Sequence, residues 1–148
     1  MENVKDGDRG RLQRLFSELN DNQAVVDLLR QQISALAGSL SELSMTVGAI
    51  KVIKDLQPST EILVPIGSDS FITAKLSSAD KVLTGLGADV MAERSAEETI
   101  KVLETRATEV QKAIERTRDE LKKLEERIEA IRPEAERLLG RAKEAPGK

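Results

Sequence analysis

The chain has 148 residues, of which 33% are charged, 39% hydrophobic and only 1% aromatic, and its net charge at pH 7 is −3. It contains no Cys and no His, which excludes disulfides, thiol catalysis and the commonest metal ligand. With two Phe and no Trp or Tyr, the composition favours long helices packed side by side through Leu, Ile, Val and Ala.

Charge distribution and hydropathy exclude further classes of protein. The sequence contains no stripe of Lys and Arg interleaved with aromatic residues, which is the pattern that indicates a nucleic-acid-binding surface. The polar N-terminal residues lack the apolar run of a secretion signal. The stretch 31–50 carries little charge, but Gln, Ser and Gly interrupt it, so a membrane span of about 18 apolar residues is not expected. We therefore expect a soluble, cytoplasmic protein.

The first predicted element is a helix over residues 11–57, because apolar residues recur there with alternating spacings of three and four. A seven-residue repeat sustained this long predicts a left-handed coiled coil. Its polar member, Asn22, is interpreted as fixing the register, and Pro58 ends the helix. The two seam registers are Leu12, Leu19, Val26, Ile33, Leu40, Val47 and Leu15, Asn22, Leu29, Leu36, Leu43, Ile50.

Residues 60–94 predict two β-hairpins in series. The β-rich runs 60–66 and 71–76 flank a turn, and the runs 81–86 and 89–94 flank Gly87-Ala88. The first strand carries apolar residues on both faces, and isolated hairpins are marginally stable with open edges. We therefore expect these strands to pack against strands of other subunits. Gly85-Leu86-Gly87 is interpreted as a turn between strands, since a dinucleotide loop needs a third glycine and a following helix.

A second helix is predicted over residues 95–140, followed by a tail over 141–148. Ser95 and Glu98 form a capping box at its start, and Pro133 is expected to kink or weaken its last turns. Paired carboxylates such as Glu97 and Glu98 lie near Lys or Arg and are interpreted as ion-pairing groups, so no enzyme is expected. The seam registers are Ile100, Ala107, Ile114, Leu121, Ile128, Ala135 and Leu103, Val110, Thr117, Leu124, Ile131, Leu138.

Together these elements predict one α+β domain over residues 1–148: a long antiparallel coiled-coil hairpin with two β-hairpins at its hinge. Antiparallel pairing brings the start of the first helix to the end of the second helix, at the tip furthest from the strands. Phe16 and Leu139 lie one place beyond the seam and widen its apolar stripe. This tip is either a fraying end whose apolar residues cover one another or an exposed, adaptable apolar patch.

Residues 61–67, 70–72 and 81–88 closely resemble the central signature of the archaeal prefoldin alpha subunit family. Two hairpins indicate the alpha class, because the beta class has one. The resemblance implies an ATP-independent cochaperone (holdase) without cofactors or metal, in which two alpha and four beta subunits join their hairpins into an oligomeric β-barrel platform. It implies that the coiled-coil tips capture unfolded or nascent polypeptides and transfer them to a group II chaperonin.

The resemblance assigns two sets of residues. The candidate client contacts at the distal tip are Leu12, Leu15, Phe16, Leu19, Leu138 and Leu139. The candidate assembly residues in the hairpins are Ile62, Val64, Ile66, Phe71, Ile72, Val82, Leu83 and Leu86. The alternative is a structural coiled-coil adaptor that oligomerises through its hairpins and binds one defined partner. Abundant Glu, Arg and Lys without Cys are also typical of a thermophilic source.

Overall fold

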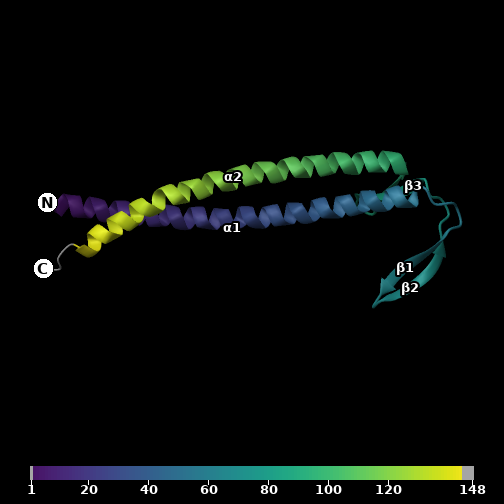
Figure 1. Cartoon of the computed structure of the whole chain (residues 1–148), viewed down its shortest axis with the longest axis horizontal. Helices are drawn as coiled ribbons and strands as arrows, with labels where there is room; N and C mark the ends of the chain where they lie inside the picture. The colour runs from purple at the N-terminus through teal and green to yellow at the C-terminus, as the bar shows by residue number, and fades with distance from the viewer. Residues whose placement is uncertain (1, 145–148) are drawn as a thin grey trace. The chain divides into compact units, whose positions relative to one another are not determined.

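The computed structural model describes residues 2–144 as two long helices with four strands between them (Figure 1). Their bounds are α1 (Glu2–Ile53), β1 (Glu61–Gly67), β2 (Ser70–Lys75), β3 (Lys81–Gly87), β4 (Val90–Ser95) and α2 (Ala96–Glu144). This is the predicted α+β order of helix, two hairpins and helix. Contacts divide the chain into a terminal unit (Met1–Ala37 with Lys112–Lys148) and a strand unit (Gly38–Gln111).

The helix ends differ from those that the apolar repeat predicts. Helix α1 begins at Glu2 rather than 11 and ends at Ile53 rather than 57, and α2 continues past Gly140 to Glu144. The apolar repeat marks only the turns in which a helix buries a face, so it does not predict helical turns that bury none. At the other end Pro58 disfavours helical geometry at Gln57, and the chain turns away through a bond from the Leu56 N–H to the Ile53 carbonyl (2.9 Å).

Helix α2 passes through Pro133 without ending. A proline removes one helical N–H donor and crowds the preceding turn, which is why a weakened end is expected there. The seam residues on either side, Ile131 and Ala135, are each only 2% exposed. Their packing stabilises the last turns of α2 across the proline.

The terminal unit is an antiparallel pair of helices. Its core cluster consists of Leu15 from α1 and Ile131, Ala135 and Leu138 from α2, with Leu12 and Leu19 packed against it. Ion pairs join Arg11 to Glu134, Glu18 to Arg127 (2.9 Å) and Arg30 to Glu125 (2.9 Å). Residue numbers rise along α1 as they fall along α2, as an antiparallel pair requires. All the predicted seam positions in this unit are buried or half-buried, which confirms the heptad register.

The strand unit has its own core where the helices meet the strands. Val47 and Ile50 of α1 pack with Ala96, Ile100 and Leu103 of α2. Leu43 and Val82 pack against this cluster, so β3 contributes a side chain to the helical core. Lys51 and Glu104 form an ion pair across the helices (3.3 Å).

The start of α2 has the Ser95 half of the predicted capping box. The Glu98 N–H donates to Ser95 Oγ (3.1 Å), and the Thr99 hydroxyl donates to the Ser95 carbonyl (2.9 Å). The Ala96 N–H donates to the carbonyl of Asp80 (2.7 Å), which ties the helix to the segment before β3. The Ser78 hydroxyl donates to the Asp80 carboxylate (2.6 Å) and lowers the pKa of Asp80. These bonds fix where the hairpins join α2.

The two hairpins are copies of one arrangement displaced by 20 residues. Glu61 pairs with Lys75 in the first, and Lys81 pairs with Ser95 in the second. Both have an irregularity before the loop, at Pro65/Gly67 and at Gly85/Gly87. The loop pairs Ser68-Asp69 and Ala88-Asp89 all have positive φ, between 49° and 60°, which is the geometry of a two-residue type I′ turn.

Each hairpin forms a separate antiparallel sheet of two strands. The strands are therefore arranged as predicted within each hairpin, and both sheets have open edges among the described residues. The barrel that would join such sheets from several subunits stays a prediction.

One window of 18 residues within Asp6–Ile53 has a mean hydropathy of 1.3, the length and composition that a membrane-spanning helix also has. Core helices of soluble proteins pass the same test, so this property alone assigns no membrane. In this structure 6% of that window is buried.

We expect Ser95→Ala to lower the free energy of unfolding by about 1 kcal/mol, because it leaves the Glu98 N–H without its capping oxygen. Thermal denaturation followed by circular dichroism measures this loss. Ser95→Asp retains a capping acceptor and serves as the matched control. An equal loss in both variants would show that the cap does not stabilise this junction.

Candidate functional site

The distal end of the coiled coil, where α1 begins and α2 ends, is the first candidate site. Of its six predicted contact residues, Leu15 (9% exposed) and Leu138 (5%) are buried in the seam, and Leu12, Leu19 and Leu139 are half-buried. Phe16 is 41% exposed. The structure thus brings the predicted residues together but gives them two roles. Leu15 and Leu138 hold the helices together, and Phe16 presents an apolar surface to solvent.

The two sides of the seam differ at this end. On one side Arg11 and Glu134, and Glu18 and Arg127, form ion pairs. On the other side, Arg30 pairs with Glu125. Phe16 lies two heptads before Arg30 on α1, and Leu139 lies two heptads after Glu125 on α2. Because the helices are antiparallel, this register places Phe16 opposite Leu139. We call the second side the Phe16 flank; it comprises Arg9, Phe16, Gln23 and Arg30 of α1 with Glu125, Arg132 and Leu139 of α2.

This arrangement limits what the end of the coiled coil can do chemically. An aromatic ring beside a half-buried Leu can receive an apolar side chain by dispersion and by burial of area. Ion pairs close the opposite side of the seam. Any apolar contact from this region is therefore directed from the Phe16 flank.

The hairpins are the second candidate site. Five of the eight predicted assembly residues are exposed: Ile66 (63%), Phe71 (56%), Ile72 (51%), Leu83 (65%) and Leu86 (54%). Ile62, Val64 and Val82 are half-buried, and Val82 packs against the helical core of its own subunit. Val82 therefore stabilises the fold of the chain itself, whereas the five exposed residues are available to a partner.

The predicted set does not include three other exposed apolar residues of the hairpins. Leu63 (67%), Val90 (53%) and Met91 (58%) are as exposed as the five exposed residues that it includes. The 20-residue repeat would have found two of them, because Leu63 corresponds to Leu83 and Met91 corresponds to Phe71.

Cross-strand pairing shows that the first hairpin is apolar on both faces. Val64 pairs with Ile72, and Pro65 pairs with Phe71 on the opposite face. Directly opposed residues share a face of an antiparallel pair, and successive residues alternate between faces. A two-stranded sheet cannot cover two apolar faces of its own. The first hairpin therefore presents apolar side chains on two faces that its own two strands do not cover.

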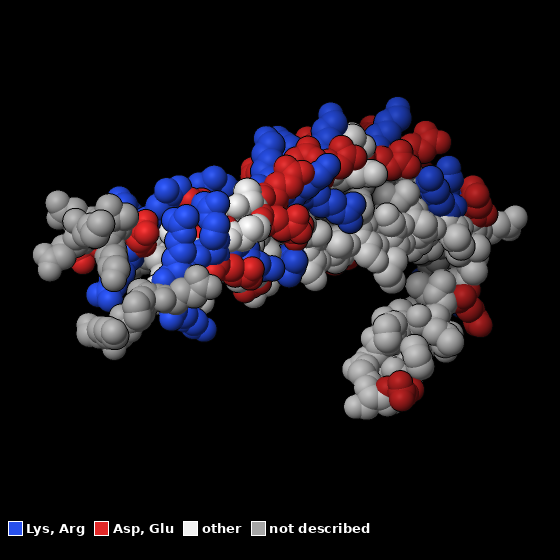
Figure 2. All heavy atoms as spheres, turned by 60° about the vertical axis from the view of Figure 1, so that its left-hand side comes forward, with Lys and Arg blue, Asp and Glu red and all other residues white. Residues whose placement is uncertain are grey.

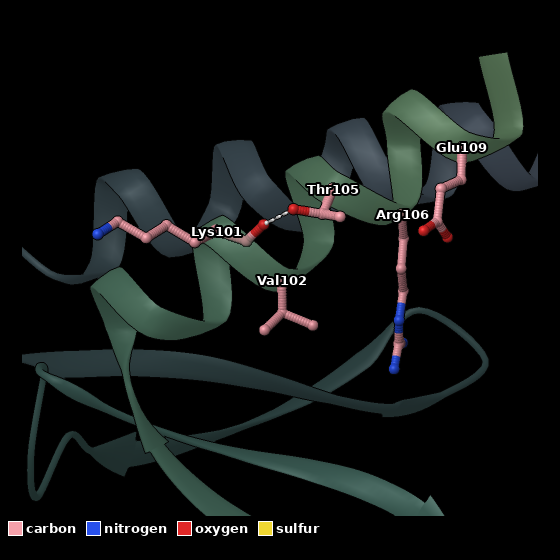
Figure 3. A pocket seen from close by; sticks show the side chains of 5 residues that line it. All are labelled: Lys101, Val102, Thr105, Arg106 and Glu109. Carbon is pink, nitrogen blue, oxygen red and sulfur yellow. Dashed lines mark hydrogen bonds between the residues drawn. The ribbon is translucent and has the colours of Figure 1, made fainter. Parts of the chain in front are cut away.

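A shallow hollow on α2 is the third place where a ligand could lie (Figure 3). Lys101, Val102, Thr105, Arg106 and Glu109 line it, all from the same helix. Figure 3 shows Val102 and Arg106 projecting from one side of the helix while Lys101 extends away from them. The Thr105 hydroxyl donates to the Lys101 carbonyl (2.9 Å), so it is occupied within the helix. This lining provides no nucleophile with an adjacent base.

Metal chemistry finds no support in the part of the chain that the structure describes. No cluster of three or more Asp or Glu residues there could hold an ion. The charged side chains of α2 instead alternate in sign along its exposed surface (Figure 2).

Comparison with known proteins identifies the class. A family model described as "Prefoldin subunit" matches residues 22–141 of the chain. "Prefoldin subunit alpha" of Methanosphaera stadtmanae is 41% identical over 89% of this chain and 94% of its own length. "Prefoldin subunit alpha" of Pyrococcus horikoshii is 32% identical over 86% of each chain. The chain belongs to the prefoldin subunit family.

Within that family the curated archaeal relatives are alpha subunits, which confirms the class that two hairpins predicted. A chain in the cryo-EM structure of filamentous PFD from Methanocaldococcus jannaschii aligns with a TM-score of 0.69 at 24% identity, over 80% of this chain and 98% of that chain. The fold is therefore that of a solved prefoldin chain. Prefoldin subunits are non-enzymatic chaperone components, so the predicted absence of an active site follows from the family.

Burial at the distal end predicts unequal effects of substituting adjacent leucines. Leu138→Ser should lower the free energy of unfolding by about 3 kcal/mol, because a buried Leu is replaced by a smaller polar residue. Leu139→Ser should cost about 1 kcal/mol or less, since that side chain is half-buried. Chemical denaturation followed by circular dichroism compares the two. Equal losses would contradict the assignment of Leu138 to the seam and Leu139 to the flank.

Proposed function

We propose that this chain is the alpha component of an ATP-independent holdase in the cytoplasm. It assembles with prefoldin beta subunits, two alpha to four beta, and captures non-native polypeptides at its coiled-coil tip for transfer to a group II chaperonin. The observation that carries the proposal is the one-sided tip, where exposed Phe16 lies opposite half-buried Leu139 with ion pairs on the other side. Membership in the prefoldin family supports the chaperone role.

Assembly through the hairpins is supported by their exposed apolar area. Leu63, Phe71 and Leu83 are each more than half exposed, on strands that also leave backbone donors and acceptors unpaired at their edges. Pairing with strands of other subunits removes both features at once. A closed barrel of such strands is the arrangement that leaves no edge.

Holding an unfolded chain requires contacts that are weak and repeated. One half-exposed aromatic ring offers a small apolar contact, and several tips on one platform multiply it through effective concentration. Weak individual contacts also permit release, which transfer to a chaperonin requires.

We expect Phe16→Ser combined with Leu139→Ser to weaken suppression of client aggregation severalfold while leaving the hexamer intact. The two substitutions remove the apolar surface of the Phe16 flank and spare buried Leu15 and Leu138. Light scattering of several unrelated denatured clients, with the assembled complex present, measures suppression.

The matched control is Leu28→Ser, which removes another exposed apolar side chain (62% exposed) from α1 outside the tip. Unchanged suppression by the Phe16/Leu139 variant would refute capture at this tip. Suppression restricted to a single client would instead favour the structural adaptor with one defined partner.

A separate experiment tests assembly. Phe71→Asp places a charge among exposed apolar residues of the first hairpin and should prevent hexamer formation, because an unpaired carboxylate would be buried in the interface. Native mass spectrometry after co-expression with a beta subunit measures the stoichiometry. Met45→Asp, at an exposed position on α1 (73%), is the control and should assemble normally. A normal hexamer from Phe71→Asp would contradict assembly through this hairpin.

A further inference from the structure

Two arginines bracket the apolar pair of the Phe16 flank. Arg9 precedes Phe16 by one heptad on α1, and Arg132 precedes Leu139 by one heptad on α2. Because the helices are antiparallel, the two arginines lie on opposite sides of the pair along the coiled coil. One heptad is about 10 Å of helix, so each guanidinium group emerges roughly that far from the apolar centre.

Among residues 6–143, the part of the chain whose side chains the structure describes, neither arginine takes part in an ion pair shorter than 4 Å. Elsewhere on this flank Arg30 faces Glu125 and binds it (2.9 Å). By the same register Arg132 faces Gln23, an amide whose nitrogen donates to Asp27 (3.2 Å). Both Arg9 and Arg132 are exposed. The flank thus replaces the usual pairing of opposite charges with two cations around an apolar centre.

The distal end of the coiled coil also has an excess of basic residues. The segments 6–19 and 127–143 contain eight basic and six acidic residues, a balance of +2 in a chain whose net charge is −3. Lys and Arg side chains gather toward this end of the molecule (Figure 2). Five acidic residues lie within four positions of either arginine, and none of them makes an ion pair shorter than 4 Å with Arg9 or Arg132: Asp6, Asp8, Glu129, Glu134 and Glu136.

We propose that the Phe16 flank selects non-native segments in which an apolar residue lies between two acidic residues, about three positions away on either side. A chain in the polyproline II conformation, which unfolded chains adopt widely, rises by about 3.1 Å per residue with three residues per turn, so residues three positions apart share a face and span the distance from the apolar centre to each arginine. The selection rests on the proposed capture of clients at this tip, and it names the class of segment captured. The apolar side chain contacts Phe16 and Leu139, while Asp or Glu on either side meets Arg9 and Arg132.

The preference should be modest and sensitive to salt. Exposed ion pairs are individually weak, so two of them should favour the acidic segment about fivefold. The screening length falls from about 10 Å at 0.1 M salt to about 3 Å at 1 M, so the preference should disappear at high salt while the apolar contact remains.

Three fluorescein-labelled peptides test the proposal against the assembled complex of alpha and beta subunits. They share a central Leu flanked at the third position on either side by Asp, by Gln or by Lys, and fluorescence anisotropy gives each dissociation constant. The wild-type complex should bind the Asp peptide about fivefold more tightly than the Gln peptide at low salt, and the Lys peptide more weakly still. In the double variant Arg9→Gln/Arg132→Gln, the three constants should become nearly equal.

The matched control is Arg14→Gln/Arg137→Gln, which removes the same charge from exposed positions of the same helices outside the Phe16 flank. It should retain the preference, and its loss there would overturn the assignment to Arg9 and Arg132. Equal binding of all three peptides by the wild type, with weaker binding in Phe16→Ser, would refute charge selection but leave capture at the tip standing. Absent binding, together with full aggregation suppression by Phe16→Ser, would refute both.

Discussion

Packing of aliphatic side chains along the seam between α1 and α2 is the interaction on which the other features of the chain depend. Residues such as Leu15 and Ile131 are buried by it, and it decides which residues of one helix face which residues of the other. Because the seam is apolar at nearly every position, burial alone would tolerate a shift of one heptad. The charged residues beside the seam disfavour such a shift. A shift either way would place Arg30 opposite Arg118 or Arg132 instead of Glu125.

The charged residues on the other side of the seam favour the same register. In the observed register Arg11 meets Glu134 and Glu18 meets Arg127. A slip of one heptad would set Arg11 against Arg127 or Arg141, and Glu18 against another glutamate. Exposed ion pairs contribute little stability, but like charges in opposition disfavour every neighbouring register at once. The position of Phe16 opposite Leu139 is therefore a consequence of charges that are not themselves part of the apolar flank.

The heptad repeat in the sequence predicts most of this structure, and the prediction becomes inaccurate where the repeat ends. Each predicted seam residue in the described chain is buried or half-buried, because a heptad repeat records the side of a helix that faces its partner. Helix ends were less predictable: residues 2–10 are helical although they carry no apolar repeat. At the tip, spacing placed Leu138 in the seam and Leu139 one place beyond it, but it could not predict that Phe16 is exposed while Leu139 is half-buried. In the hairpins, Leu63 and Met91 were missed because strand alternation was considered without the 20-residue repeat.

Aliphatic residues are buried within the chain along the coiled coil, whereas in the hairpins they stay exposed. Along the seam, aliphatic side chains find partners within one chain, so Ile131 and Val26 are nearly inaccessible to solvent. In the hairpins, tight two-residue loops hold each pair of strands in register but provide no second layer, and Leu63 and Leu83 remain about two-thirds exposed. Adding a single helix over one face would leave the other apolar face of the first hairpin open. Several copies of such sheets would cover both faces, which is why the apolar residues of this hairpin support the proposed assembly.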